Sequence, residues 1–96
     1  MFVVLLRFSN NKSHAGRFMQ DHNDWIKRGL DDGVFVLVGS LQPNAGGAIV
    51  AHNTTFSELQ TRVNTDPFVE HDVVRAEILE ITPSKTDERL AFLRAA

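Results

Sequence analysis

The sequence predicts an α+β fold with four strands and two helices in the order βαββαβ. Four short apolar segments alternate with two segments whose apolar residues recur every three or four positions. In this order the strands form one antiparallel sheet and both helices cover the same face, which is the ferredoxin-like architecture. A length of 96 residues suits one domain. We expect residues 1–82 to form its core and residues 83–96 to form a helical tail.

The first half of the chain contains two strands and the longer helix. Residues 2–8 place alternate side chains on two faces and predict the first strand. Helical spacing then continues to Asp32, and Gly33 suits the left-handed conformation that ends a helix. Residues 34–38 are apolar throughout and predict a strand buried on both faces, followed by a loop over 39–47. The predicted apolar stripe of the helix contains Ala15, Phe18, Met19, His22, Ile26, Gly29 and Leu30, and Trp25 lies off it.

The second half supplies two more strands and a shorter helix. Residues 48–52 predict the third strand, and residues 73–81 predict the last one. Between them, Thr54 or Thr55 suits the N-cap of a helix. Glu58 follows Thr55 by three residues, which is the spacing of a capping box.

The first two strands are apolar on both faces, although the helices can cover only one face of the sheet. We expect Val3, Leu5, Phe35 and Leu37, or their alternates, to lie on the uncovered face. A single chain would expose a sizeable apolar patch there. The sequence therefore predicts a homodimer in which two sheets pack face to face, and a higher assembly of such dimers stays open.

Composition excludes several functions. Ten basic and twelve acidic residues give a net charge of -2, which argues against binding to nucleic acid, and residues 47–51 offer no aromatic ring for stacking on a base. The apolar run over residues 2–6 is too short to span a membrane and follows no basic segment, so we expect a soluble, cytoplasmic protein. The chain has no cysteine and its four histidines lack metal-ligand spacing, so we expect no metal and no cofactor.

His22 and Asp66 are the candidates for chemistry. An imidazole exchanges protons near neutral pH, and His22 lies in the middle of a helix on its apolar stripe. It is either a structural histidine or a general acid/base. Asp66 precedes Pro67, which is typical of a helix N-cap. The alternative role for Asp66 is to orient the ring of His22, and one aspartate can do both.

Four further residues are candidates for substrate binding. Arg7 and Arg75 are expected on the uncovered face of the sheet, either as part of an ion pair at the rim of a dimer interface or as the anion-binding wall of a pocket. Gly39 and Ser40 end the second predicted strand. They form either a simple turn or a ligand contact, in which Ser40 donates a hydrogen bond and Gly39 allows close approach of the backbone.

Four of these segments resemble the YciI-like (YCII-related) family over roughly residues 1–82. They are the opening strand, residues 19–25 around His22, the strand that ends at residues 39–41, and Asp66-Pro67-Phe68 before the last strand. The resemblance implies a dimeric α+β barrel in which His22 and Asp66 form a dyad. It also implies that such a dyad transfers a proton, as in a family member that dehydrochlorinates a hydroxyquinone, although most members have no assigned reaction.

Two functional hypotheses follow. The first is a cofactor-free enzyme of the lyase or isomerase type, in which His22 moves a proton on a small organic, possibly anionic, substrate and Asp66 orients its ring. The second is a non-catalytic domain that binds a metabolite or serves as an accessory subunit, because the fold alone does not dictate function. The two differ in whether His22 and Asp66 meet beside a cavity.

Overall fold

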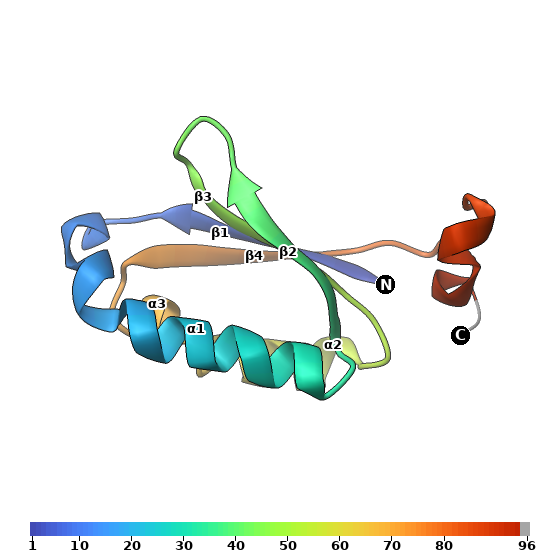
Figure 1. The fold of residues 1–96 in the computed structure, drawn as a ribbon, viewed down its shortest axis with the longest axis horizontal. Helices are drawn as coiled ribbons and strands as arrows, with labels where there is room; N and C mark the ends of the chain where they lie inside the picture. The colour runs from blue at the N-terminus through green and yellow to red at the C-terminus, as the bar shows by residue number, and fades with distance from the viewer. Residues whose placement is uncertain (95–96) are drawn as a thin grey trace.

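A computed structural model describes residues 1–94 of the chain, and Ala95 and Ala96 lie outside the described residues. One four-stranded sheet in the order β2-β3-β1-β4, with every neighbouring pair antiparallel, has its helices on one face (Figure 1). The predicted α+β, ferredoxin-like fold is confirmed. The strands are β1 (Phe2–Phe8), β2 (Phe35–Leu41), β3 (Gly46–Ala51) and β4 (Val74–Glu80). The helices are α1 (Ala15–Asp31), α2 (Phe56–Asn64) and α3 (Pro67–Glu70), with 3₁₀ turns η1 (Lys12–His14) and η2 (Glu88–Leu93).

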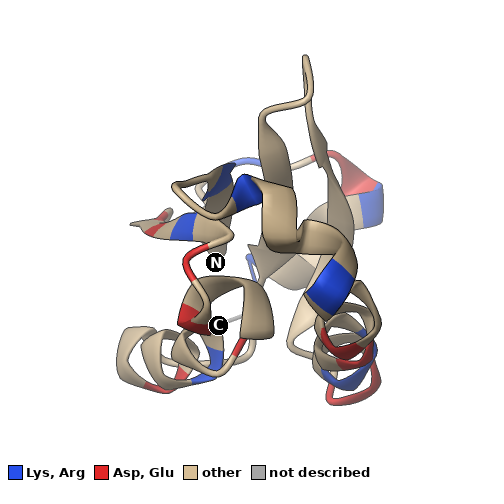
Figure 2. Cartoon of the chain, turned by 90° about the vertical axis from the view of Figure 1, so that its left-hand side faces the viewer, with Lys and Arg blue, Asp and Glu red and all other residues tan. Residues whose placement is uncertain are grey.

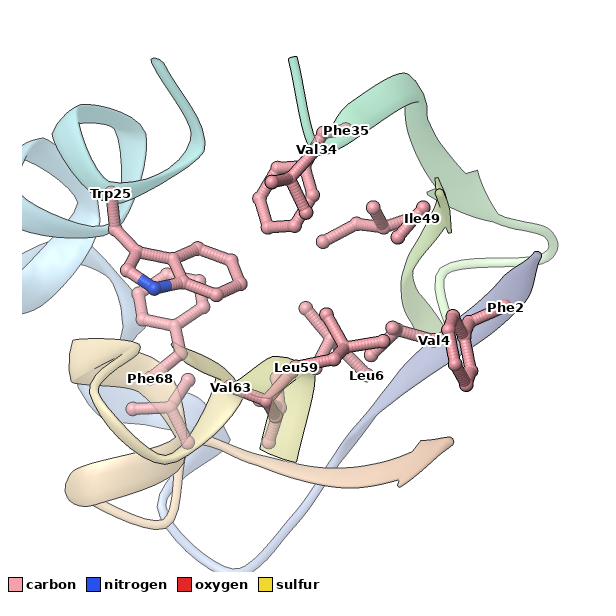
Figure 3. Close-up of a cluster of buried hydrophobic side chains, with 13 residues drawn as sticks. Phe2, Val4, Leu6, Trp25, Val34, Phe35, Ile49, Leu59, Val63 and Phe68 are labelled. Atoms are coloured by element: carbon pink, nitrogen blue, oxygen red, sulfur yellow. The ribbon is translucent and has the colours of Figure 1, made fainter. Parts of the chain in front are cut away.

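The hydrophobic core lies between the sheet and the two longer helices. β1 is an inner strand because it pairs with both β3 and β4, and its alternate residues Phe2, Val4 and Leu6 are buried against the helices (Figure 3). α2 contributes Leu59 and Val63 to the same core, both fully buried. Within residues 1–94 no helix is long and apolar enough to cross a membrane.

Trp25 corrects the predicted orientation of α1. Its side chain is only 2% exposed and packs edge-on against Phe35, with ring centroids 5.1 Å apart. The buried line of the helix therefore runs through His22, Trp25 and Gly29, and Leu30 of the predicted stripe is exposed. The reason is Gly29, which has no side chain and so lets the ring of Phe35 lie directly against the helix.

Gly29 gives a prediction about packing. A Cβ at this position would lie 2.1 Å from Cδ2 of Phe35, so we expect Gly29→Ala to lower the free energy of unfolding by about 1–3 kcal/mol. Gly16→Ala on the same helix is the matched control, since its Cβ would meet nothing within 4 Å and alanine favours a helix. Urea denaturation of both variants checks the prediction, and equal midpoints would contradict it.

The second strand differs from its prediction. β2 was expected over residues 34–38 and buried on both faces, but it continues to Leu41, lies at the edge of the sheet and leaves Val36, Leu37 and Val38 exposed. Gly39 and Ser40 are paired with β3 and lie inside the strand rather than in a turn. The cause is the strand order, because β3 pairs with β1 and leaves β2 with a neighbour on one side only.

The helix caps agree with the sequence, whereas the tail does so only in part. The Thr55 side chain accepts a hydrogen bond from the Glu58 backbone N–H and the Glu58 side chain accepts one from the Thr55 backbone N–H, so the capping box is confirmed. Residues 83–87 have no regular structure, and only Glu88–Leu93 are helical, as 3₁₀ rather than α-helix. This segment projects from the end of the sheet (Figure 1).

The face of the sheet without helices carries both apolar and charged side chains. Leu37 and Leu79 are exposed there, while Phe35, one of the residues expected on this face, is buried in the core. A register shift between Phe35 and Leu37 explains the difference, since one extra residue reverses the alternation of the strand. The apolar residues of this face are Val3, Leu5, Leu37, Ala48, Val50 and Leu79.

Candidate active site

His22 and Asp66 lie together although 44 residues separate them in the chain. Nδ1 of His22 is 2.7 Å from Oδ1 of Asp66. His22 comes from the middle of α1, whereas Asp66 lies between α2 and α3. Relative exposure is 9% for His22 and 0% for Asp66, so the pair is almost withdrawn from solvent. The structure thus brings together the two residues singled out from the sequence.

The local sequence explains the position of Asp66. It is the N-cap of α3, with an extended backbone, and Pro67 occupies the first turn. Its Oδ1 accepts a hydrogen bond from the Phe68 backbone N–H at 3.0 Å, so one oxygen serves both the cap and His22. Among residues 1–94, Oδ2 of Asp66 is the one buried side-chain polar atom without a hydrogen-bond partner. Oδ2 has therefore lost its hydrogen bonds to water without gaining one from the protein.

The carboxylate determines which ring nitrogen is free. An ionised carboxylate only accepts hydrogen bonds, so Nδ1 of His22 carries the hydrogen of this contact, and in the neutral ring the lone pair is then on Nε2. The ring of Phe68 stacks on the imidazole with centroids 3.9 Å apart and planes 5° apart. The ring centroid of Trp25 lies 5.9 Å from that of the imidazole, and Nε1 of Trp25 donates a 3.0 Å hydrogen bond to the Arg62 carbonyl. Asp66 therefore holds the imidazole at its edge, and the ring of Phe68 holds it at its face.

A cavity of about 310 Å³ lies beside His22. It is bounded by α1, by Phe68 and by the helix side of all four strands. None of the described residues that line it is Asp, Glu, Lys or Arg. Residues 33–57 contain none of these types, and the β2–β3 hairpin is accordingly free of charged positions in Figure 2. Besides His22, the polar side chains at the cavity are those of Asn23 and Ser40.

The structure divides the four predicted binding residues into two pairs. Gly39 and Ser40 line the cavity. Arg7 and Arg75 do not line it, and their expected role as the anion-binding wall of a pocket stays a prediction. They are cross-strand neighbours in a separate hollow of about 460 Å³, and Arg7 donates a 2.8 Å hydrogen bond to exposed Glu77. Their register on β1 and β4 points both away from the helices.

Sequence reasoning missed some of the residues around His22. Asn23 follows it directly on α1, and Met19 lies one turn before it, so helical spacing was a usable signal for the cavity wall. Phe68 was noted only as part of a triplet, and nothing in the sequence shows that its ring stacks on His22. The described residues include no group of three or more His, Asp or Glu side chains placed to hold a metal ion.

No family model matches the sequence, and no curated protein matches it. The structure is similar to that of 5-chloro-2-hydroxyhydroquinone dehydrochlorinase from Burkholderia phenoliruptrix AC1100, solved in complex with 2,5-dihydroxybenzoquinone. The TM-score is 0.67, the sequences are 11% identical, and the match covers 84% of this chain and 93% of the other. The two proteins share a fold. This likeness agrees with the fold class predicted from the sequence.

Proposed function

We propose that this protein is a small YciI-like enzyme that transfers a proton on a small organic molecule, with His22 as general acid/base and Asp66 as the group that orients it. The observation that carries the proposal is the 2.7 Å contact between the two side chains at the edge of a cavity. A base held by an acceptor on its far nitrogen is the arrangement that general acid/base catalysis requires. The fold shared with a dehydrochlorinase supports a reaction of the same kind.

The proposed reaction begins with the lone pair on Nε2 of His22. Nε2 takes a proton from a carbon of the bound substrate, and the electrons of that C–H bond form a new π bond. In an elimination, a leaving group departs from the neighbouring carbon with its bonding electrons. In an isomerisation, His22 returns the proton to another carbon. Asp66 stabilises the imidazolium between these steps, and the proton transfer contributes about 10²–10⁴-fold to the rate.

The cavity indicates the class of substrate. Its volume of about 310 Å³ suits a molecule the size of a single substituted ring. No lysine or arginine is among the described lining residues, so a carboxylate would find no cation there except a protonated His22. Hydroxyl and carbonyl groups of a ligand can form hydrogen bonds with the side chains of Ser40 and Asn23, which both donate and accept. We therefore favour a small ring with hydroxyl or carbonyl substituents, a class to which the dihydroxybenzoquinone bound by the structural neighbour belongs.

Hydrogen exchange tests the proposed function. The protein is incubated in D₂O with 2,5-dihydroxybenzoquinone. His22 carrying a deuteron adds it to a ring carbon of the enolate, and the neutral imidazole then takes the original proton from that tetrahedral carbon and restores the C=C bond. Loss of the ring C–H signal is followed by proton NMR. We expect the wild type to accelerate exchange and His22→Asn to leave it at the uncatalysed rate. Backbone amide shifts of Ser40 and Gly47 report binding in both proteins. Binding without accelerated exchange would contradict the enzyme and favour a metabolite-binding domain.

We also propose that two chains pack sheet to sheet. On the uncovered face a single chain leaves Leu37 and Leu79 exposed and Val3, Leu5 and Val50 partly exposed, and pairing two such faces would bury them. Leu79→Arg is expected to give single chains, because a charge in that interface would be desolvated without a partner. Leu30→Arg is the matched control, since Leu30 on α1 is 45% exposed and Leu79 is 42% exposed. Sedimentation equilibrium measures the mass, and a monomeric wild type would exclude the dimer.

A further inference from the structure

Phe68 contacts both members of the dyad through different parts of the residue. Its backbone N–H donates to Oδ1 of Asp66 at 3.0 Å, and its ring lies parallel to the imidazole of His22 at a centroid distance of 3.9 Å. The residue is only 5% exposed and also lines the cavity. Among the described residues, Phe68 is the one that both donates a hydrogen bond to Asp66 and stacks its ring on His22.

A single hydrogen bond does not fix the plane of an imidazole. The contact from Nδ1 of His22 to Asp66 restrains one ring atom, but coupled changes in χ1 and χ2 can still tilt the ring about that atom. Such a rotation would move Nε2, on the opposite side of the ring, relative to a substrate in the cavity. A flat ring stacked within 5° of parallel opposes the rotation, because tilting the imidazole would bring it into Phe68. The stacking therefore restrains the one freedom that the hydrogen bond leaves.

We infer that Phe68 is a positioning residue, whose ring holds the plane of His22 so that Nε2 faces the cavity. Its backbone N–H holds the Asp66 carboxylate at the same time. The effect of Phe68 on catalysis rests on the proposed function, whereas its effect on the orientation of the His22 ring does not. A misplaced reacting atom costs about 10²-fold in rate, and the loss falls on kcat because the rest of the cavity still binds substrate.

Two substitutions distinguish the role of the Phe68 ring from the role of its backbone N–H. Phe68→Leu removes the aromatic face but keeps the backbone N–H that Asp66 accepts, and Phe68→Tyr keeps the face. Phe2→Leu is the matched control for loss of a buried ring, since Phe2 is 4% exposed in the core and is not among the residues that line the cavity. Urea denaturation of all three variants identifies the conditions under which each is folded.

The first readout is the ring of His22 itself, measured by ¹⁵N and ¹³C NMR without any substrate. We expect a single tautomer with hydrogen on Nδ1, protected from solvent exchange, in the wild type, Phe68→Tyr and Phe2→Leu. In folded Phe68→Leu we expect a mixture of tautomers and rapid exchange of the Nδ1 proton. A single, protected tautomer in Phe68→Leu would overturn the inference.

The second readout is the exchange reaction on 2,5-dihydroxybenzoquinone. We expect Phe68→Leu to lower kcat about 10²-fold with little change in KM, and Phe68→Tyr to restore it. Loss of kcat in Phe2→Leu as large as in Phe68→Leu would overturn the catalytic part. If the wild type catalyses no exchange but Phe68→Leu still shows a mixture of His22 tautomers, the positioning role stands and the proposed function fails.

Discussion

Asp66→Asn is expected to lower the rate of proton transfer by about 10² or more while the protein stays folded. Oδ1 of Asp66 accepts from two donors, the Phe68 backbone N–H and Nδ1 of His22. An amide oxygen can take the same position and accept both bonds, so the tautomer of His22 is retained. The negative charge that stabilises the imidazolium is lost, and the rate falls for that reason alone.

The same substitution has a cost in stability. The amide nitrogen would occupy the place of Oδ2, where no described residue offers a hydrogen-bond partner. A buried, unsatisfied donor costs about 1–3 kcal/mol, so we expect the free energy of unfolding to fall by that amount. The exchange assay and urea denaturation measure the two effects, and ¹⁵N NMR checks the tautomer.

Asp72→Asn is the control for this prediction. Asp72 lies six residues further along, accepts a hydrogen bond from Ser9 at 2.9 Å and is not in contact with His22. Asparagine also tolerates its positive φ of 56°. This variant is expected to retain the wild-type rate. An Asp66→Asn protein as active as the wild type would show that the carboxylate charge contributes nothing to the reaction.

Gly46→Ala is expected to cause the largest loss of stability, about 2–6 kcal/mol. Gly46 has a φ of 125°, which side chains rarely tolerate, and a Cβ there would lie 1.9 Å from the carbonyl oxygen of Leu6. That oxygen belongs to the backbone of an inner strand, so it cannot rotate away. The alternative is to separate β3 from β1 at the rim of the cavity, which breaks their pairing.

Gly47→Ala is the matched control for Gly46→Ala. Gly47 lines the same cavity, but its Cβ would meet its nearest neighbour, the carbonyl oxygen of Gly39, at 3.4 Å. We expect only a small change in its denaturation midpoint. If both variants unfold at the same urea concentration, the close approach of Gly46 to Leu6 does not limit stability.

The elements that depend on local sequence were predictable. The alternation along β1, the capping box at Thr55 and the N-cap at Asp66 each arise from a few neighbouring residues. The contact between His22 and Asp66 was expected only from the resemblance to the YciI-like family, which singled out these two residues, because nothing in the local sequence relates positions 44 residues apart.

The remaining features depend on distant parts of the chain. Trp25 is buried because Gly29 admits Phe35 from another element, so no pattern within α1 reveals it. The exposed edge position of β2 follows from which strand β3 pairs with. Arg7 and Arg75 are separated from the cavity by the sheet itself, and the stacking of Phe68 on His22 requires two helices to be placed first.

The position of β2 at the edge of the sheet also affects how the chain behaves before it is fully assembled. On one side the backbone N–H and C=O groups of this strand pair with no other strand among residues 1–94, and Val36, Leu37 and Val38 beside them are exposed. Natural edge strands are usually guarded by lysine, proline or inward-pointing charge against pairing with another chain. β2 contains none of these. A crowded solution of newly made chains would therefore be prone to intermolecular β-sheet growth along this strand.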